Sequence, residues 1–404
     1  MLATLRRVRG MFAEGRLGVL LFCWLGWVFD FHDLMLFQFV QRDVARDLGL
    51  ELATDIPWID GWTLLATAVG GFWFGRIADR VGRRRALTGS ILMYSGGAFL
   101  TGLADGYASL LVARVVTGIG VGGEWGVGHA VVAETFPPAM RNRAAAILQA
   151  GTPVAMALAA VVGCFVAPQV GWRACFLGSA APALLVFFAR RALPGVDRAP
   201  GRDGAPWREL WSEAHRRAAV TIFALLVLHM TGFWCTYAWL PRMMFADLAA
   251  TPAFVGTFFL CVNGVHVVAD IAFGPLADRF GRRRVFAASC VLFAAGLLVV
   301  ALTWQTLAQD RVAFVAALAL VGLGAGTWSC FGVLFAENFA ASVRGTAAAG
   351  FYNLARGVQG ATQPLLAAAI ATTGTFTTAL HVGVVTALMS AVVIRWVPRV
   401  ERDR

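Results

Sequence analysis

Lysine is absent from this sequence, and charged residues of either sign are scarce. All 34 basic residues are arginines, only 14% of the 404 residues are charged, and 59% are hydrophobic. A soluble domain carries about 25% charged residues. A chain this poor in charge cannot cover an ordinary water-facing surface, so we expect most of its surface to face lipid.

The arginines are not placed as in a nucleic-acid-binding protein. The formal net charge is +11, and a strong basic excess is one mark of nucleic-acid binding. Here, however, the arginines lie beside apolar segments, where anionic lipid headgroups and the positive-inside rule account for them. We therefore expect the lipid bilayer to be a partner of this chain and nucleic acid not to be one.

Motifs for catalysis, cofactors and metals are also missing. The seven cysteines form no CxxC pair and no Cys/His ligand spacing, and their odd number excludes a complete disulfide framework. All seven lie in or beside apolar runs, which is typical of small core residues. No GxSxG motif and no phosphate-binding loop occurs. The sequence thus predicts a protein that is not an enzyme and that holds neither a metal nor a cofactor.

What the sequence does contain is a series of long apolar windows. Windows of roughly 20 residues can cross a hydrocarbon core of about 30 Å as helices. The first window follows three N-terminal arginines and reaches Val40, which is too long for the apolar part of a cleavable signal, so we expect it to be retained. The predicted fold is an all-α membrane protein with twelve transmembrane helices, which begin near Leu17, Ile56, Ala86, Tyr107, Asn142, Trp172, Ala218, Thr251, Val285, Arg311, Thr346 and Phe376.

The arginines indicate which side of the membrane each loop faces. Arg114 and Arg356 lie inside predicted spans, and 27 of the 34 arginines lie in the termini and the even-numbered loops. The odd-numbered loops hold the other five, which are Arg42, Arg46, Arg173, Arg242 and Arg311. The positive-inside rule then places both termini in the cytoplasm. Because an all-arginine basic set is typical of a GC-rich bacterial genome, we expect a multi-pass protein of a bacterial inner (plasma) membrane.

A stretch rich in proline, glycine and arginine separates two halves of six spans each. We predict an N-terminal six-helix bundle at 1–190, a cytoplasmic linker at 191–217 and a C-terminal six-helix bundle at 218–404. Within the linker, Trp207–Arg217 has the composition of a short amphipathic helix.

The two halves repeat one another in sequence. Gly75–Arg85, GRIADRVGRRR, recurs as Gly274–Arg284, GPLADRFGRRR. Such duplications build many transporters as two pseudo-symmetric bundles with a central site between them. We therefore expect two pseudo-symmetric six-helix bundles.

Several segments resemble those of a known family. The GRIADRVGRRR loop resembles the signature loop of the major facilitator superfamily, and Arg114–Gly123, RVVTGIGVGG, resembles that superfamily's second motif. Three shorter stretches are similar to the proton symporters for organic acids, which include sialate/lactate, aromatic-acid and shikimate/oxoglutarate-type groups. These stretches are Asp30–Asp33, Gly123–Trp125 and Tyr352–Arg356.

The resemblance implies secondary active transport by alternating access, with proton-coupled symport of a small organic anion such as a carboxylate, aromatic acid or sugar acid. The coupling ion would be the proton, the partner a small-molecule substrate, and the working unit a monomer. The alternative is proton-antiport efflux of drugs or metabolites, for which Gly151-Thr-Pro153 is a faint echo of the helix 5 motif of antiporters. The sequence names neither the substrate nor the direction of transport.

The repeated loops contain candidate gating residues. The resemblance implies a gating role for Asp79, Arg80 and Arg83, and for Asp278 and Arg279 in the second half. A carboxylate at such a place can pair with an arginine and with a helix N-terminus when the cytoplasmic side is closed. The alternative is that these charges serve only to orient the loops in the membrane.

A second pair of charges occurs in each half near the cytoplasmic helix ends. Glu134 and Arg141 are seven residues apart, as are Glu337 and Arg344. We expect each pair to form a salt bridge between loops that helps to lock the closed state.

Charges inside membrane spans are expensive, and they indicate function by default. Asp30 and Asp33 are three residues apart and share a helix face, and Arg114 is expected at a similar depth, roughly 20 Å above the inner face. An arginine beside two acids suits proton coupling, although a static ion-pair network is the alternative. Glu124 is a candidate second proton station, inner-gate partner or packing residue.

Helix 11 supplies the candidates for substrate binding. Arg356 is the predicted partner of a substrate carboxylate, aided by Tyr352, Asn353 and Gln359; pairing of Arg356 with an acid such as Glu337 is the alternative. His32, between the two acids of helix 1, is a candidate proton relay or a histidine held in one tautomer. A further polar face on helix 8 comprises Asn263, His266 and Asp270.

Overall fold

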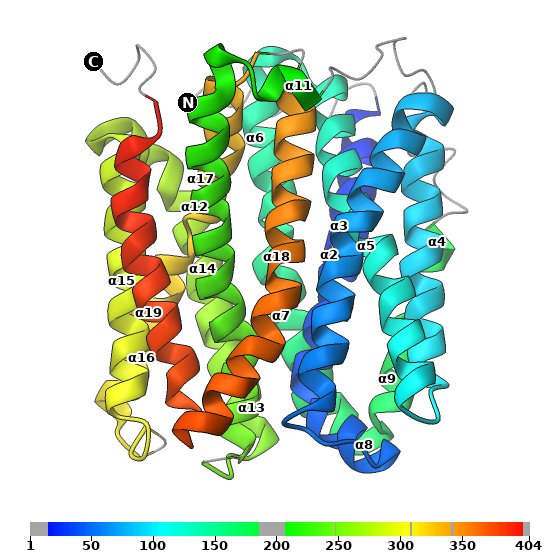
Figure 1. The fold of residues 1–404 in the computed structure, drawn as a ribbon, viewed down its shortest axis with the longest axis vertical. Helices are drawn as coiled ribbons and strands as arrows, with labels where there is room; N and C mark the ends of the chain where they lie inside the picture. Colours follow the sequence, from blue (N-terminus) through cyan, green and yellow to red (C-terminus); the bar gives the residue numbers. More distant parts are fainter. Residues whose placement is uncertain (1–14, 186–206, 247, 308, 341–342, 399–404) are drawn as a thin grey trace.

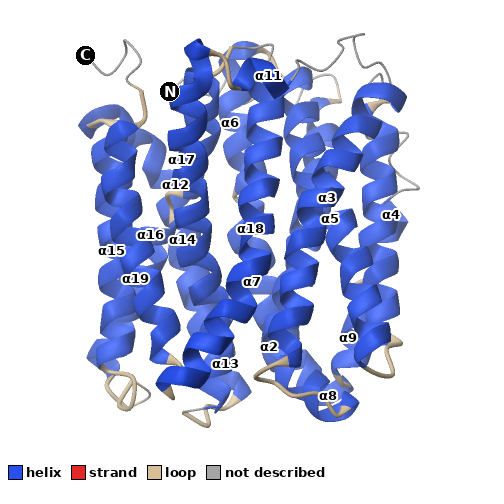
Figure 2. Ribbon diagram, viewed as in Figure 1, coloured by secondary structure: helices blue, strands red, loops and turns tan. Residues whose placement is uncertain are grey.

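The computed structural model describes residues 15–185 and 207–398, except 247, 308 and 341–342. Within these residues the regular elements are helices, with no strand among them (Figure 2). Twelve helical spans run between two ends of one bundle (Figure 1). The predicted all-α membrane fold with twelve helices is therefore confirmed. Residues 191–206 of the predicted linker lie outside the described residues, so the domain boundaries stay a prediction.

The first six spans form the N-terminal half. Its first four spans are single helices, namely α2 (Arg16–Leu48), α3 (Asp55–Val81), α4 (Arg83–Gly102) and α5 (Tyr107–Thr135). The fifth span is broken into α6 (Pro138–Gln149), α7 (Gly151–Val161), the π-helical turn η1 (Val162–Val166) and α8 (Ala167–Val170). One cause of the breaks is Pro153, which has no N–H to donate to the carbonyl of Gln149. The described part of the sixth span is α9 (Trp172–Gly178) and the 3₁₀ turn η2 (Ala181–Leu184).

The last six spans form the C-terminal half, which opens with the short α11 (Trp207–Leu210). The predicted amphipathic helix at Trp207–Arg217 is wrong in extent, because Glu213 already begins the seventh span. The six spans are α12 with α13 (Glu213–Tyr237 and Trp239–Ala246), α14 (Pro252–Phe280), α15 (Arg282–Leu302), α16 with α17 (Arg311–Ala325 and Trp328–Asn338), α18 (Arg344–Thr373), and α19 with the 3₁₀ turn η3 (Thr377–Val393 and Ile394–Trp396).

Not all spans are equally apolar. In the described part of the chain, eight helical segments are long and apolar enough to cross a membrane by length and composition. The other four spans contain α3, α4, α9 and α18. Two of these, α3 and α18, cross each other where the two halves meet: a Cβ at Gly61 would lie 2.5 Å from the carbonyl oxygen of Gly360. Small residues at such a crossing allow two backbones to approach closely. They also have less apolar surface than large side chains, so a helix rich in them has a lower hydropathy.

The repeated loops adopt the same turn. Gly82 ends α3 with φ 111°, and Gly281 ends α14 with φ 88°. Both values lie in the region that favours glycine, since a Cβ there is strained. The helix that follows starts at once with an arginine, Arg83 in one half and Arg282 in the other.

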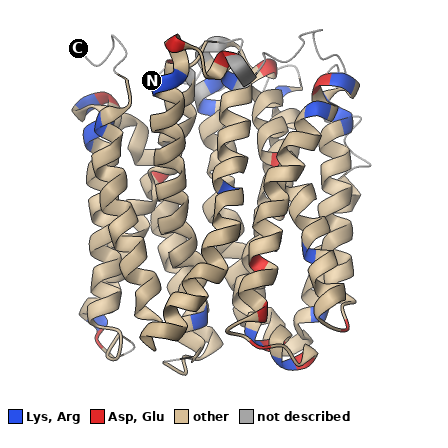
Figure 3. Ribbon diagram, in the orientation of Figure 1, with Lys and Arg blue, Asp and Glu red and all other residues tan. Residues whose placement is uncertain are grey.

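Charged residues gather at the two ends of the bundle, with few between them (Figure 3). We call the end with the Gly82 and Gly281 turns the near end, and the end with the Gly49 and Gly374 turns the far end. The first described helix starts at the near end and α19 finishes there (Figure 1). This distribution suits a bundle whose middle lies in hydrocarbon.

Neighbouring glycines on α4 provide a test of the packing. A Cβ at Gly97 would lie 2.3 Å from the hydroxyl of Thr117 and 2.5 Å from its backbone nitrogen, whereas a Cβ at Gly96 would meet nothing within 4 Å. Overpacking a tight contact costs about 1–3 kcal/mol. We expect Gly97→Ala to lower the thermal unfolding temperature of the detergent-purified protein by several degrees. The matched control, Gly96→Ala, should leave it unchanged; equal temperatures for the two variants would contradict the α4–α5 packing.

Candidate functional site

A small cavity lies between the two halves near the middle of the bundle. Its volume of about 10 Å³ is close to the space of one water molecule. Six helices contribute its lining, and the three polar side chains in it are Gln149, Thr152 and Arg356. The remaining lining is apolar or aromatic and consists of Phe31, Met230, Phe233, Trp234, Trp328 and Tyr352. We call this space the central cavity.

Arg356 of α18 is the charged residue that lines the central cavity. Its side chain is buried, and Nη2 donates to the hydroxyl of Tyr352 at 3.0 Å. The guanidinium lies 4.8 Å from the ring centre of Tyr352, 5.8 Å from that of Trp27 and 5.9 Å from that of Phe31. Its Nη1 is buried without a hydrogen-bond partner among the described residues. An unsatisfied buried donor costs about 1–3 kcal/mol, so Arg356 is suited to receive an anionic group.

Tyr352 is held by rings from the opposite half. Its ring stacks on Trp125 of α5, with the centroids 3.8 Å apart and the planes 7° from parallel. Trp125 in turn donates to Gln149 at 3.4 Å, and Gln149 donates to Thr152 at 3.1 Å. Thr152 also accepts from Trp27 at 3.0 Å. This chain of contacts gives the central cavity one polar wall in the N-terminal half, which sequence reasoning missed although Gln149 and Thr152 are polar residues in an apolar span.

Asp33 and Arg114 form a buried ion pair in the N-terminal half. The Arg114 guanidinium donates to an Asp33 carboxylate oxygen at 2.7 Å, and both side chains are almost fully buried. The rings of Phe37 and Phe176 lie beside the guanidinium, at 4.8 and 5.8 Å. The sequence predicted similar depths for the charges of α2 and α5, and in the structure Asp33 and Arg114 do meet. The role of this pair in proton coupling stays a prediction.

Asp30 differs from Asp33 although it lies on the same face of α2. Its side chain is fully buried, and neither carboxylate oxygen has a hydrogen-bond partner among the described residues. It interacts electrostatically with Arg356 across the boundary between the halves, and with Glu124 and Asp33 on its own side. Burying a carboxylate without a hydrogen-bond partner costs free energy. The structure therefore separates Asp30, which has no such partner among the described residues, from Asp33, which is paired with Arg114.

Glu124 lies within the packing of the N-terminal half. One carboxylate oxygen accepts from Ser90 of α4 at 3.1 Å, while the other is buried without a partner among the described residues. Its carboxylate rests against Gly26 of α2, where an added Cβ would come within 2.3 Å. Glu124 thus contacts α2 and α4 within its own half, and its role as a proton station, an inner-gate partner or a packing residue stays a prediction.

Three other predicted site residues do not line the central cavity. Gln359 bonds within the C-terminal half, where it donates to the Val227 carbonyl at 3.4 Å. Asn353 donates to the Ala349 carbonyl at 3.0 Å and packs over Gly71 of α3. His32 is buried with both ring nitrogens unpaired among the described residues. The structure therefore brings only Arg356 and Tyr352 of the predicted binding set to the cavity.

At the near end, Arg83 joins two acids of the N-terminal half. It donates to Asp79 at 2.8 Å and to Glu134 at 3.3 Å. The predicted Glu134–Arg141 bridge is therefore wrong: Arg141 instead donates to the Phe136 carbonyl at 2.9 Å. The reason is local, since Arg83 follows the tight Gly82 turn and reaches both acids, whereas Arg141 turns back to cap the end of α5.

The C-terminal half repeats the pairing of this arginine with the second acid. Glu337 pairs with Arg282 rather than with Arg344, and Arg344 donates to the Phe339 carbonyl at 3.3 Å. The predicted Glu337–Arg344 bridge is thus wrong for the same reason. The alternative pairing of Arg356 with Glu337 is also excluded by this geometry. The other predicted gating residues are exposed at the near end, namely Arg80, Asp278 and Arg279.

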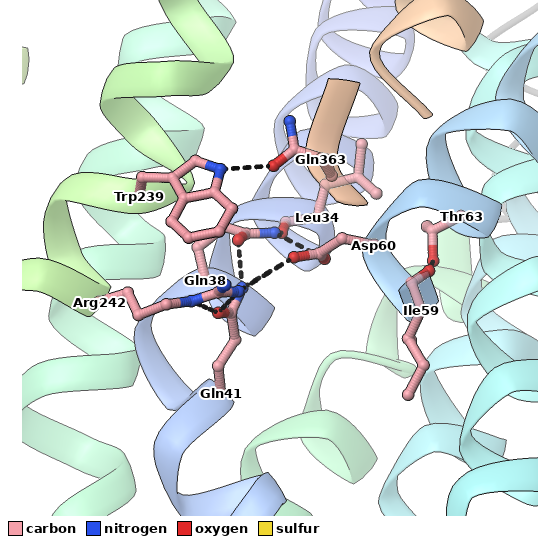
Figure 4. Close-up of polar contacts among 9 residues, drawn as sticks. All are labelled: Leu34, Gln38, Gln41, Ile59, Asp60, Thr63, Trp239, Arg242 and Gln363. Atoms are coloured by element: carbon pink, nitrogen blue, oxygen red, sulfur yellow. Dashed lines mark hydrogen bonds and ion pairs between the residues drawn. The ribbon is translucent and has the colours of Figure 1, made fainter. Parts of the chain in front are cut away.

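A polar network at the far end joins the two halves, and sequence reasoning missed it (Figure 4). Arg242 of α13 donates through Nε to Gln41 of α2 at 2.7 Å and lies 3.6 Å from the Asp60 carboxylate of α3. Asp60 accepts from Gln41 at 3.0 Å and from Gln38 at 3.1 Å. Trp239 donates to Gln363 at 2.9 Å and lies 4.4 Å from the Arg242 guanidinium.

The prediction that Arg242 belongs to an odd-numbered loop is wrong, because the seventh span continues through α13 and buries it. The available signal was the acid Asp60 inside the second span, together with Gln38 and Gln41, which are three residues apart on one helix face.

The polar face predicted on helix 8 is also buried. His266 Nε2 lies 3.5 Å from the carboxylate of Asp270. Asn263 donates to the Phe259 carbonyl at 2.8 Å. None of the three lines the central cavity.

Comparisons with known proteins agree with this fold. The sequence profile of the Major Facilitator Superfamily matches residues 22–246 and 222–404. The chain is 30% identical over 351 residues to the "Probable 4-methylmuconolactone transporter" of Cupriavidus pinatubonensis, covering 83% of this chain and 79% of the relative. It is 27% identical over 346 residues to the gentisate transporter of Corynebacterium glutamicum, covering 82% and 76%. The solved structure of a D-xylose-proton symporter matches with a TM-score of 0.77 at 17% identity, covering 96% of this chain and 99% of the other.

Proposed function

Because this chain belongs to the Major Facilitator Superfamily and is a membrane transporter rather than an enzyme, we propose that it carries a small organic anion together with a proton by alternating access. The relatives named for gentisate and for 4-methylmuconolactone support a substrate with a carboxylate or lactone on a small ring or conjugated chain.

The observation that carries this proposal is the environment of Arg356. A buried guanidinium with one unpaired nitrogen faces a cavity that both halves line with aromatic rings. A carboxylate would occupy the free nitrogen, and a planar ring would pack against Phe31, Trp328 or Tyr352. The cavity is almost filled, so the substrate is admitted only when the halves move apart.

Asp30 supplies the coupling to protons in this proposal. When it is ionised, Asp30 competes with the substrate anion for the charge of Arg356. When it is protonated, the guanidinium is free for the substrate. Two negative charges beside one arginine repel each other, so the proton and the organic anion favour each other's binding. Mutual enhancement of this kind is what symport requires. Glu124, within electrostatic range of Asp30, is the candidate for passing the proton onward, with Asp33 and Arg114 as a fixed pair beside it.

We assign the near end to the cytoplasm and the far end to the outside of a bacterial plasma membrane, as the arginine distribution indicates. The near-end pairs around Arg83 and Arg282 would then be broken and re-formed as the inner side opens and closes.

A single chain lines both sides of the central cavity, so we propose that the monomer is the transporting unit.

Uptake by the purified protein in liposomes tests the proposal. An inward proton gradient is imposed, and a panel of labelled ring acids, short carboxylates, sugar acids and neutral sugars is supplied outside. We expect one acid to accumulate and the accumulation to collapse with a protonophore. The opposite result is no accumulation, with proton release from loaded vesicles when drug-like cations are added; it would assign the protein to antiport efflux.

A further inference from the structure

A second cavity lies at the far end, between α2 of one half and α13 of the other. Its volume is about 220 Å³, somewhat below the roughly 300–1,000 Å³ of sites for drug-sized ligands. Arg42 and Ala246 on its rim are exposed, so the cavity reaches the surface. Its full lining is Gln38, Phe39, Gln41, Arg42, Leu52, Arg242, Phe245 and Ala246. We call it the far cavity.

The lining of the far cavity is suited to an anion with an apolar body. Both charged residues that line it, Arg42 and Arg242, are positive. Asp60 is not part of the lining, and its two oxygens accept from the amide groups of the lining residues Gln38 and Gln41. The other walls are mostly apolar. Such a combination matches a small carboxylate joined to a ring or hydrocarbon chain.

Arg242 is buried but incompletely satisfied. Its contacts with Gln41 use Nε and Nη2, and the Asp60 carboxylate lies 3.6 Å from Nη2, beyond an ordinary hydrogen bond. Nη1 is buried with no hydrogen-bond partner among the described residues. A carboxylate that accepts two hydrogen bonds from the Arg242 guanidinium would satisfy its donors better than the present contacts do.

We propose that the far cavity is a second carboxylate-binding site, separate from the one at Arg356, at which the substrate anion first binds from the outside. This inference rests on the proposed uptake of an organic anion. It adds the site at which the anion first binds and the effect of that binding on the contacts between the halves. An anion bound there competes with Asp60 and Gln41 for Arg242 and repels the Asp60 carboxylate. Because Arg242 belongs to one half and Asp60 to the other, binding weakens the network that bridges the halves and thereby favours opening at the far end.

The test measures protection of a cysteine placed in the far cavity. Six of the seven native cysteines are buried and Cys261 is exposed, so Leu52→Cys is introduced together with Cys261→Ser in the full chain. The protein is reconstituted in liposomes, and the rate of modification by a membrane-impermeant maleimide is followed. Benzoate is the anionic probe, and benzamide, of the same shape without charge, is its control. We expect benzoate to slow modification several-fold and benzamide to have no effect.

Three variants separate the far cavity from the central one. Arg242→Gln and Arg42→Gln should each abolish protection by benzoate. Because Arg42 is exposed, Arg42→Gln does so without altering the buried contacts between Arg242, Gln41 and Asp60. Arg356→Gln should leave protection intact. Loss of protection in Arg356→Gln, or protection that persists in both Arg42→Gln and Arg242→Gln, would overturn the proposal.

The outcome is independent of the uptake measurement. If no acid is accumulated but benzoate still protects the cysteine, then the proposed transport fails while the far site stands. If an acid is accumulated yet neither it nor benzoate protects the cysteine, then the far site is refuted and the transport proposal remains.

Discussion

Replacing Arg356 by glutamine is expected to raise the KM for uptake of the transported acid by roughly 10- to 150-fold, since a hydrogen bond to a charged group contributes about 1.5–3 kcal/mol. Glutamine keeps an amide donor on a shorter side chain and removes the charge that attracts the carboxylate. The KM of Arg356→Lys should lie between those of the unchanged protein and Arg356→Gln, because an ammonium group retains the charge without the planar pair of donors. The measurement is initial uptake into liposomes as a function of substrate concentration.

Tyr352→Phe is the matched control for this prediction. It removes the hydroxyl that accepts from Arg356 at 3.0 Å but keeps the ring stacked on Trp125, so the pocket retains its shape. We expect a small rise in KM and an unfolding temperature that is lower by at most a few degrees, because Nη2 of the buried Arg356 loses its partner. An unchanged KM in Arg356→Gln, with the protein folded, would show that this arginine does not hold the substrate.

Asp30→Asn is expected to abolish proton-driven accumulation while exchange of labelled for unlabelled substrate across the membrane continues. Asparagine is neutral in every state, so it imitates the protonated carrier and leaves Arg356 available to the anion. Without proton release the gradient can no longer be coupled to uptake. The two assays are run on the same liposomes, with and without a proton gradient. A variant that still accumulates substrate in response to the gradient would contradict the assignment of Asp30.

Asp33→Asn provides the contrast, because Asp33 is the partner of a buried arginine. Removing one member of a buried ion pair costs about 3–5 kcal/mol, since the other charge remains uncompensated. We expect a lower unfolding temperature together with reduced accumulation and reduced exchange. In the double variant Asp33→Asn with Arg114→Gln, the unfolding temperature should recover most of this loss. Normal stability in Asp33→Asn alone would argue against a structural role for the pair.

These predictions separate two carboxylates that the sequence presents as equivalent. Asp30 and Asp33 share a helix face, and spacing alone assigns either of them to Arg114. The choice depends on the rotation and depth of α2 relative to α5, which the packing of glycines and rings between those helices sets. In the structure Arg114 pairs with Asp33, whereas Asp30 interacts electrostatically with Arg356 of the other half.

Much of the fold was readable from the sequence because it depends on local properties. The length of an apolar run decides whether a helix crosses the bilayer, and the repeated glycine–arginine loop specifies the same turn at Gly82 and Gly281. The burial of Arg356 likewise agrees with the position of this one charge within a predicted span. Such inferences need only neighbouring residues and the properties of the membrane.

Which distant side chains meet depends on how the helices pack in three dimensions. Arg242 and Gln41 are 201 residues apart, and the bond between them forms because the two halves close against each other at the far end. Similarly, Arg83 rather than Arg141 reaches Glu134, because a tight turn aims one arginine at the acid while a helix cap occupies the other. The spans, the repeat and the charged residues within the membrane could all be read from local sequence patterns. Their partners were decided by helix rotation and packing, which bring together groups that no local pattern connects.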